Sequence, residues 1–497
     1  MAKALKSSAS KFKYVSQSQL TLVGFDTPFS QNLDANNRWV ILAKKIPWDS
    51  LTNIYSKQLN NENKGADGIN PRVIIGSLII KHLCNFSDRE TINAIQENIY
   101  MQYFIGYSSF SNEPPFDASL FVGIRKRLGA AQINEKILQL NEVLPDTNTN
   151  QDEGESKNED DHQQGDQEQK ETVENEGELI VDATACPQDI SYPTDLNLLN
   201  DAREKSEQLI DILCTLKAIA KPRTYREIAR KQYLKVAQKK NKTRKEIRAA
   251  NKKQLACLQR NIKNIYVLLR QFERIPFNKN EYKYFLVIQT FYDQQSEMHK
   301  KRIHSIDNRI VSIHQPHVRP IVRGKANAKV EFGAKIDVSI TNGFAFLEES
   351  SWDAYNEGTT LIATIERYKK RTGRYPKKVF ADKIYCNRAN RKRLKELKID
   401  LVAKPLGRPS KAMEPSHIRP GDRNPIEGKF GQAKTAYGLN RIKARLADTS
   451  LSWIATIIMV LNLVKLTGKV LYCSMHKIIM ERMTKQMLYL YYIMELE

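Results

Sequence analysis

Cysteine is scarce in this sequence, and the few cysteines are not arranged for metal binding or cross-linking. No Cys-x-x-Cys spacing occurs among the six, which are Cys84, Cys186, Cys214, Cys257, Cys386 and Cys473. This pattern excludes a zinc ribbon and a disulfide framework, and it fits a reducing cytoplasm. His314 and His317 form a His-x-x-His pair, but Pro316 between them argues against a ligand-bearing helix, so we expect both in a loop.

The sequence also lacks a long uninterrupted hydrophobic run. Its first residues, MAKALKSSASKFKY, are basic, but no apolar stretch follows them, so no signal peptide is evident. The most apolar segment, residues 454–466, contains Thr456 and Asn462 and is shorter than the ~20 residues that a membrane span requires. We expect this segment to form a buried helix, and we expect no membrane partner.

Acidic residues are too few to balance the basic ones. Lysine and arginine number 79 against 56 aspartates and glutamates, which gives a formal net charge of +23. An excess of this size favours polyanionic partners, because basic side chains displace condensed counterions from nucleic acid. A solvated basic surface without a nucleic-acid partner is the alternative.

Many of the acidic residues are concentrated in one segment, residues 146–178. Thirteen acidic residues stand there against two lysines, a net charge of −11, so the rest of the chain carries +34. A low-complexity segment of this composition cannot bury a core, and we expect it to be a disordered acidic linker.

The length of 497 residues and the hydrophobic share of 41% suggest two to four domains. Helix-start signals occur before the linker, at Asn70-Pro71 and in the capping box Ser87–Glu90. The helices that meet at Asn85-Phe86 fit either a DNA-binding helix-turn-helix or a plain helical bundle. We expect an N-terminal arm at 1–39, a helical DNA-binding domain at 40–145, the linker at 146–178, a catalytic domain at 179–470 and a C-terminal tail at 471–497.

Within the predicted catalytic domain, strand patterns lie before and after a helical insertion. The apolar run Leu179–Ala183 predicts a buried strand, and a basic insertion follows at about 197–325, whose spacing suggests an antiparallel helical hairpin. Its lysines and arginines are either a solvated face or a track for a DNA backbone. From residue 328 the pattern predicts a β-hairpin at Asn342-Gly343, then helix, strand, helix and strand. The predicted class is α/β: a ribonuclease-H-like mixed sheet with a long helical insertion, preceded by an all-α N-terminal domain.

Three acidic residues occupy positions suited to metal binding. Asp182 and Asp382 each end a predicted apolar strand, where ligands of open α/β sheets collect. Glu427 lies in a predicted helix that begins after Asn424-Pro425 and can pass these strand ends. Magnesium prefers oxygen ligands, and two ions about 3.5–4 Å apart activate an attacking oxygen and stabilise a leaving one. An acid after a strand is also common as a turn or cap, so that interpretation stays open for each residue.

Two basic residues accompany Glu427. Arg423, Glu427 and Lys434 are spaced four and seven residues apart, which places them on one helix face if the helix begins that early. Arg423 and Lys434 are therefore candidates for holding DNA phosphates beside the metal ions. A salt-bridged helix face explains the same spacing.

Several segments resemble the bacterial insertion-sequence DDE transposases, in the branch with a helical N-terminal domain and a Y-R-E-K signature. The resembling segments run from PWDSLTNIYSKQL to GIRKRLG and include LIVDATACPQDISYPTDLNLLNDAR, RIVSIHQPHVRPIVRGKANAKVEFGAKI, VFADKIYCNRANRKRL and GDRNPIEGKFGQAKTAYGLNRIKARL. The family's two aspartates match Asp182 and Asp382. The arginine, glutamate and lysine of the signature match Arg423, Glu427 and Lys434, whereas its tyrosine would fall on Pro420 and is absent.

The resemblance implies a transposase that binds transposon ends, cleaves them and joins them to target DNA by metal-dependent phosphoryl transfer. Asp182, Asp382 and Glu427 would hold two Mg²⁺ ions, with Mn²⁺ as a substitute, and the partner would be double-stranded DNA. The implied assembly is a homo-oligomer on DNA, in the bacterial cytoplasm and associated with the nucleoid. A ribonuclease-H-like nuclease or resolvase without transposition is one alternative, and a transposase-derived DNA-binding regulator is another.

Overall fold

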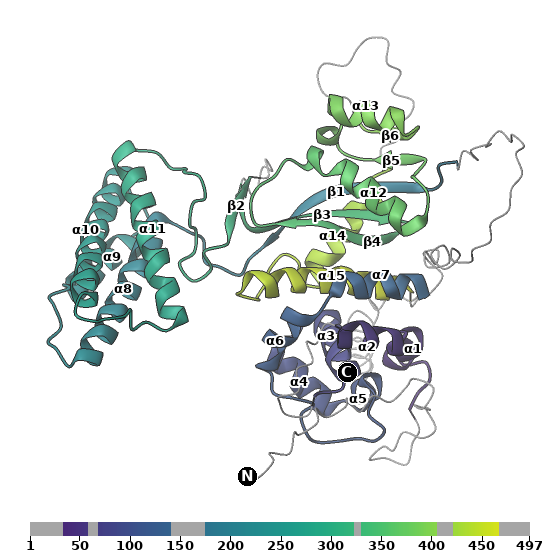
Figure 1. Ribbon diagram of the computed structural model, residues 1–497, viewed down its shortest axis with the longest axis horizontal. Helices are drawn as coiled ribbons and strands as arrows, with labels where there is room; N and C mark the ends of the chain where they lie inside the picture. Colours follow the sequence, from purple (N-terminus) through teal and green to yellow (C-terminus); the bar gives the residue numbers. More distant parts are fainter. Residues whose placement is uncertain (1–32, 58–67, 141–173, 323–329, 405–420, 467–497) are drawn as a thin grey trace, which may run out of the picture.

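The computed structural model describes residues 33–57, 68–140, 174–322, 330–404 and 421–466. They form a helical N-terminal part, a mixed sheet flanked by helices, and a helical insertion that stands to one side of the sheet (Figure 1). Residues 1–32 of the predicted arm, residues 146–173 of the predicted acidic linker and the whole predicted tail lie outside the described residues. Pro420 lies outside them as well.

Helices make up the N-terminal part of the described chain. They are α1 (Arg38–Lys45), α2 (Trp48–Lys57), α3 (Pro71–Cys84), α4 (Asp88–Glu97), α5 (Ile99–Ile105), α6 (Leu120–Arg127) and α7 (Ala130–Leu140). The Asn70 side chain accepts a hydrogen bond from the backbone of Arg72 at the start of α3, and Ser87 and Glu90 form the expected capping box of α4. The all-α character predicted for this part is confirmed.

The sheet is mixed, with the strand order β2-β3-β1-β5-β6 and with β4 also paired to β3. Its strands are β1 (Glu178–Pro187), β2 (Arg319–Val322), β3 (Val330–Thr341), β4 (Phe344–Ser351), β5 (Lys378–Phe380) and β6 (Asp400–Val402). β3 runs antiparallel to β1, β2 and β4, whereas β5 runs parallel to β1 and to β6. Asn342 and Gly343, both at positive φ, make the predicted hairpin turn between β3 and β4.

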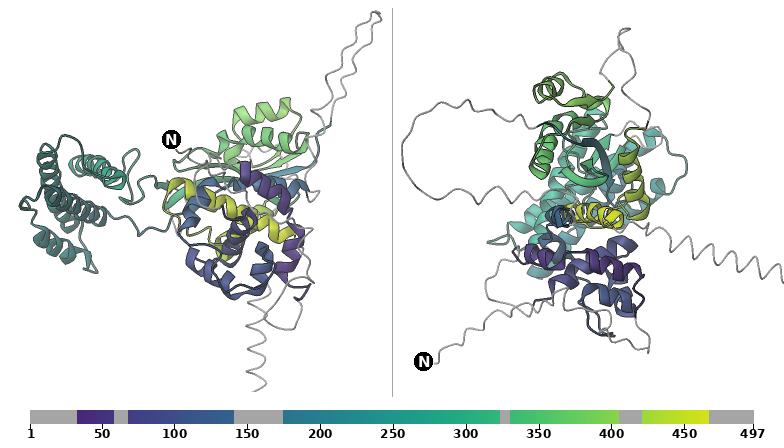
Figure 2. Two further views of the ribbon diagram at one scale, coloured as in Figure 1. Left: turned by 60° about the horizontal axis from the view of Figure 1, so that its bottom comes forward. Right: turned by 90° about the vertical axis from the view of Figure 1, so that its right-hand side faces the viewer.

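Helices cover both faces of this sheet (Figures 1 and 2). On one face, Val181 of β1 packs in a core with residues of α12 (Leu361–Thr372) and α13 (Arg388–Glu396). On the other, Val338 of β3 packs with residues of α14 (Asn424–Ala436) and α15 (Ala447–Leu466). Successive side chains of a strand point to opposite faces, so Asp182, which follows Val181 and pairs with Val338, lies on the α14 face.

The helical insertion leaves the sheet after β1. Its helices are α8 (Asp195–Lys217), α9 (Arg226–Ala237), α10 (Arg244–Leu269) and α11 (Lys279–Lys301), and they enclose an apolar core of their own that includes Leu258 and Phe291. The prediction of a two-helix hairpin was therefore incomplete. α8 ends at Ala218 in the left-handed region shortly before Pro222, and the side chains of Thr243 and Asn278 cap two further helix starts.

The segment that connects the insertion back to the sheet differs from the prediction. Residues assigned to the end of the insertion, Arg319–Val322, form β2 against the start of β3. This strand is four residues long and contains Pro320, so it carries too little alternation to be read from the sequence. His314 and His317 lie in the loop before β2, as expected.

Helix α15 joins the N-terminal helices to the sheet. It is the one helix among the described residues that is long and apolar enough to cross a membrane by composition, yet most of it is buried inside the protein. The buried side chain of Asn462 donates to Asn134 Oδ1 of α7 at 2.9 Å and to the Ala345 carbonyl of β4 at 2.7 Å. Trp453 packs its ring edge-on to His82 of α3 at 4.9 Å. The apolar segment is thus the buried helix expected from the sequence.

Candidate active site

Asp182 and Asp382 lie just beyond the point where the parallel pairing of β1 with β5 ends. Asp182 lies in the middle of β1 and does not end it as predicted, because β1 continues to Pro187 along β3. β1 pairs with β5 in register, with Ile180 opposite Phe380, and each aspartate lies two residues beyond this pair. β1 continues along β3, whereas after β5 the chain turns into the short 3-10 helix η4 (Lys383–Tyr385). Both carboxylates therefore occupy the carboxyl edge of the parallel strands, where α/β sheets bind ligands.

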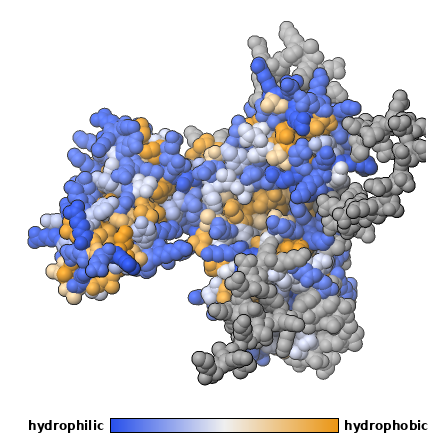
Figure 3. All heavy atoms as spheres, viewed as in Figure 1, coloured by the Kyte–Doolittle hydropathy of each residue, from blue (hydrophilic) through white to orange (hydrophobic). Residues whose placement is uncertain are grey.

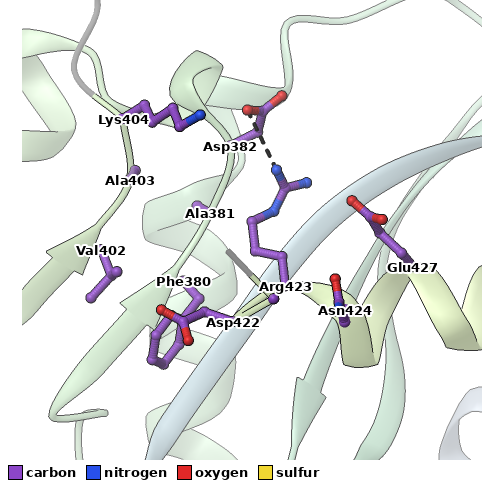
Figure 4. A pocket seen from close by; sticks show the side chains of 11 residues that line it. Phe380, Ala381, Asp382, Val402, Ala403, Lys404, Asp422, Arg423, Asn424 and Glu427 are labelled. Carbon is purple, nitrogen blue, oxygen red and sulfur yellow. Dashed lines mark ion pairs between the residues drawn. The ribbon is translucent and has the colours of Figure 1, made fainter. Parts of the chain in front are cut away.

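Helix α14 brings Glu427 to the same edge. The helix begins at Asn424, has Pro425 in its first turn, and packs on β1 and β3. A cavity of about 220 Å³ lies between this helix start and the ends of β5 and β6, and its lining includes Asp382, Arg423 and Glu427. In Figure 4 the Glu427 carboxylate points toward the guanidinium end of Arg423, the end that also pairs with Asp382.

Arg423 connects the two aspartates. Its Nη2 atom lies 2.8 Å from Asp182 Oδ2, and its Nη1 atom lies 3.4 Å from Asp382 Oδ1 (Figure 4 marks the second pair). The pairs are partly buried, since the side chains of Arg423 and Asp182 are 28% and 17% exposed. One guanidinium therefore neutralises carboxylates from two neighbouring strands, just beyond the point where their pairing ends.

Comparison with known proteins identifies two segments of the chain. Residues 379–464 match the family described as "Transposase DDE domain", and residues 27–127 match "Transposase domain (DUF772)". The protein named ORF8 of the nfe locus in Rhizobium meliloti is 29% identical over 174 residues, which cover 34% of this chain and 73% of that protein. This chain is therefore similar to transposases of the DDE family along these two segments. No solved structure matches it.

The match to a DDE domain also bears on the fold. A DDE domain is ribonuclease-H-like, and the mixed sheet with helices on both faces agrees with that class, so the fold prediction is confirmed. The matched segment contains Asp382, Arg423, Glu427 and Lys434, whereas Asp182 lies before it. The assignment of Asp182 therefore depends on the strand pairing and on its ion pair with Arg423.

Burial and charge act in opposite directions on Asp182. Burial raises the pKa of its carboxyl, while the Arg423 guanidinium and the backbone N–H of Ala183 lower that pKa and the charge of Glu357 raises it further. Asp382 is half exposed, and its Oδ1 atom accepts a hydrogen bond from the backbone N–H of Lys383 at 2.7 Å. Asp382 is thus both a cap of η4 and a partner of Arg423, so the two interpretations of this acid are compatible.

The donor set fits a hard divalent cation. Carboxylate oxygens are the preferred protein ligands of Mg²⁺, and two carboxylates at this edge already share one positive charge. As they stand, no three His, Cys, Asp or Glu side chains in the described part of the chain are grouped closely enough to hold a metal ion. Arg423 holds the place between the aspartates, so Asp182, Asp382 and Glu427 would hold an ion only after its guanidinium has moved.

Lys434 occupies a different position from Arg423. It lies near the end of α14, partly buried, and it is not among the residues that line the cavity. Arg423 precedes the first residue of the same helix and faces both aspartates. The proposed phosphate-binding role of Lys434 therefore remains a prediction, with less support from the geometry than that of Arg423.

Sequence reasoning missed several polar residues around this edge. Lys404, Asp422 and Asn424 line the cavity with the predicted residues. Glu357, in the 3-10 helix η3 (Glu357–Thr359), affects Asp182 electrostatically from the segment after β4. Glu357 follows no strand directly, so the rule that singles out acids at strand ends could not find it.

Proposed function

We propose that this protein is a transposase that binds the ends of its own mobile element, cleaves them and joins them to target DNA by two-metal phosphoryl transfer. Asp182, Asp382 and Glu427 would hold the two Mg²⁺ ions, and Mn²⁺ would substitute for them. The observation that supports this most is that Arg423 pairs with both Asp182 and Asp382 and lines one cavity with Asp382 and Glu427.

Bound divalent ions would lower the barrier by activating the attacking oxygen and stabilising the leaving oxygen of the phosphodiester. The protein's own side chains would form the binding site for these ions. Asp182 lies within β1 and Asp382 directly after β5, on neighbouring strands, and Glu427 approaches from the first turn of α14. Their carboxylates concentrate negative charge that a cation must neutralise, and Arg423 fulfils that need in the protein alone.

Arg423 would then change partners. When the aspartates bind a cation, the guanidinium no longer has to neutralise them, and its planar fork suits two oxygens of a DNA phosphate. Its Nε atom is buried and makes no hydrogen bond among the described residues, so this N–H group can donate a hydrogen bond to a DNA phosphate. We assign Arg423, and with it Lys434, to holding DNA phosphates beside the reacting one.

The partner we propose is double-stranded DNA, bound by a homo-oligomer in the bacterial cytoplasm at the nucleoid. The charge of the chain supports the partner, because +23 overall is a large excess for 497 residues. The basic helices α9 and α10 of the insertion would follow the DNA backbone. Lys235, Lys240, Lys245 and Arg248 on this side of the insertion are all exposed.

The test is an assay of full-length protein with linear DNA that carries the two ends of the element, in Mg²⁺. We expect cleavage at the end sequence and transfer of the new 3′ ends into a second DNA. Cleavage without joined products would make the protein a nuclease or resolvase, and specific binding without cleavage would make it a regulator. The DNA beside the gene gives an earlier check, since short terminal inverted repeats should flank it.

A further inference from the structure

A group of polar residues near Asp182 has no role in the proposed chemistry. Its members belong to β3, to the segment after β4 and to η4, and they lie toward the sheet face that α12 covers. The group, which we call the Glu357 cluster, consists of Lys335, Asp337, Tyr355, Glu357 and Tyr385.

The backbone at Glu357 is held against the loop that follows Asp382. The Gly358 carbonyl accepts hydrogen bonds from the side chains of Asn387 at 3.2 Å and Asn390 at 2.7 Å. A side chain at position 358 would not fit, because a Cβ atom there would lie 2.6 Å from the Ile384 carbonyl oxygen. The segment that carries Glu357 is therefore fixed on η4, directly beside the strand ends of the candidate active site.

The two acids of the cluster differ in how their oxygens are used. Both oxygens of Asp337, a fully buried residue, accept hydrogen bonds, one from the Tyr355 hydroxyl at 2.7 Å and the other from Thr360. Glu357 instead forms an ion pair with Lys335, 2.8 Å from Nζ to Oε1, and its side chain stays 21% exposed. Glu357 is therefore the acid that can exchange its partner without leaving buried hydrogen bonds unmade.

The hydroxyl of Tyr385 points to a missing partner in the same place. Tyr385 is fully buried, and its hydroxyl makes no hydrogen bond within the described residues. Burial raises its pKa, and the charges of Asp337, Glu357 and Asp182 raise that pKa further. A buried hydroxyl without a partner is costly, so a group that accepts its hydrogen bond is expected there.

We propose that Glu357 is a fourth carboxylate of the metal site, which binds the divalent ion held by Asp182 after exchanging Lys335 for that ion. The hydroxyl of Tyr385 would donate to a water molecule or carboxylate oxygen around the bound ion. This inference rests on the proposed function, because it assumes a metal ion at Asp182. The alternative interpretation is that the ion pair between Glu357 and Lys335 is purely structural.

The experiment compares Mn²⁺ binding by full-length variants, measured by calorimetry and by the rise in melting temperature that Mn²⁺ produces. We expect Glu357→Gln to weaken Mn²⁺ binding by about ten- to a hundredfold and to reduce the melting-temperature rise. Glu297→Gln is the matched control, since it removes an equal charge and the ion pair with Lys301 from the distant insertion. The acidic segment 146–178 contributes equally to every variant.

Two further variants separate the interpretations. Lys335→Gln should leave Mn²⁺ affinity unchanged or raised, because lysine competes with the ion for Glu357. The proposal is overturned if Lys335→Gln weakens Mn²⁺ binding as much as Glu357→Gln does, or if Glu357→Gln binds Mn²⁺ as the control does. Asp182→Asn decides which claim has failed: unchanged Mn²⁺ affinity in this variant refutes the metal site itself. Weakened binding there with normal binding by Glu357→Gln refutes only the role of Glu357.

Discussion

The sheet edge and the helical insertion both carry charge, but they use it differently. At the edge, Arg423 is 28% exposed and has fixed partners at 2.8 and 3.4 Å from two strands. In the insertion, residues 228–253 contain eleven lysines and arginines against one acidic residue, Glu246. Most of these basic side chains are exposed, and the surface of the insertion is largely hydrophilic in Figure 3. The charges at the sheet edge act through their fixed positions, whereas the charges of the insertion act through their number.

This difference separates chemistry from affinity. A charge that is fixed and partly buried acts on one bound group, because solvent screens it little. Exposed charges act together on a long polyanion by releasing counterions, and each contributes a similar amount. Substitutions at the edge should therefore change reaction rates at constant affinity, whereas substitutions in the insertion should change affinity at a constant rate.

The largest effect is expected at the three acids. Asp182→Asn, Asp382→Asn and Glu427→Gln should each slow DNA cleavage by at least about a thousandfold, or about 4 kcal/mol, because each removes a charged metal ligand. Affinity for end DNA should change little in a filter-binding or gel-shift assay. Asp400→Asn, in the adjacent strand β6, is the matched control and should cleave normally. Substantial Mg²⁺-dependent cleavage by one of the three variants would remove that residue from the site.

A smaller effect is expected from the two basic residues of α14. Arg423→Ala should lower the single-turnover cleavage rate by roughly ten- to a hundredfold, since a charged hydrogen bond contributes about 1.5–3 kcal/mol. Arg423→Lys should recover part of that loss, because lysine lacks the planar fork. Lys434→Ala should also slow cleavage if it holds a phosphate.

The controls for these variants come from the same region. Arg441→Ala removes an exposed arginine that pairs with Asp189 at 2.9 Å, and it should leave the cleavage rate unchanged. Normal rates with a lowered melting temperature in Arg423→Ala would reduce this arginine to a structural ion pair. The same outcome for Lys434→Ala would reduce Lys434 to a residue of a salt-bridged helix face.

The insertion should show the opposite pattern. Changing four exposed lysines, 239, 240, 242 and 245, to glutamine should weaken DNA binding and make its salt dependence less steep, by about 0.9 in the log–log slope per lost phosphate contact. The single-turnover rate at saturating DNA should be normal. Equal loss of charge at the ends of α11, at Lys279, Lys300, Lys301 and Arg302, gives the comparison. An unchanged slope in the first variant would identify the connection between α9 and α10 as a merely solvated surface.

The smallest effect on the reaction is expected at the joint between the N-terminal helices and the sheet. Asn462→Ala removes the side chain that bonds to both Asn134 of α7 and Ala345 of β4, and Asn134 Oδ1 and the Ala345 N–H lose these bonds. The Ala345 carbonyl keeps the bond that it accepts from Asn134 Nδ2 at 3.3 Å. We expect a loss of about 1–3 kcal/mol in the free energy of unfolding and near-normal cleavage well below the melting temperature. Chemical denaturation measures the first quantity. A large loss of cleavage in the folded variant would mean that this joint positions the active site.

The sequence predicted the parts of the fold that depend on local signals. The strand that contains Asp182, the hairpin at Asn342-Gly343 and the helix caps at Asn70 and Ser87 all follow from apolar patterns and turn or cap chemistry. The end of that strand was misplaced, because β1 continues to Pro187 along β3. The sequence failed where the signal was short or non-local. β2 has four residues and a proline, so it lacked a pattern.

The candidate site was predictable only in part for the same reason. Two of its acids follow apolar runs, and Glu427 follows an Asn-Pro helix start, so all three stood out. The ion pair of Arg423 with Asp182 joins residues that are 241 positions apart, and no sequence spacing encodes it. Glu357 was missed because its position depends on the packing of η3 on η4, which becomes visible only in three dimensions.

Anomalous scattering from Mn²⁺, in crystals of the full-length protein bound to its end DNA, would show whether the three acids hold metal ions. We expect two Mn²⁺ peaks about 3.5–4 Å apart, surrounded by Asp182, Asp382 and Glu427. We also expect that the Arg423 guanidinium has left the position between the two aspartates and contacts a DNA phosphate. A DNA complex with no Mn²⁺ at these acids, or with Arg423 still bridging Asp182 and Asp382, would contradict the proposed two-metal site.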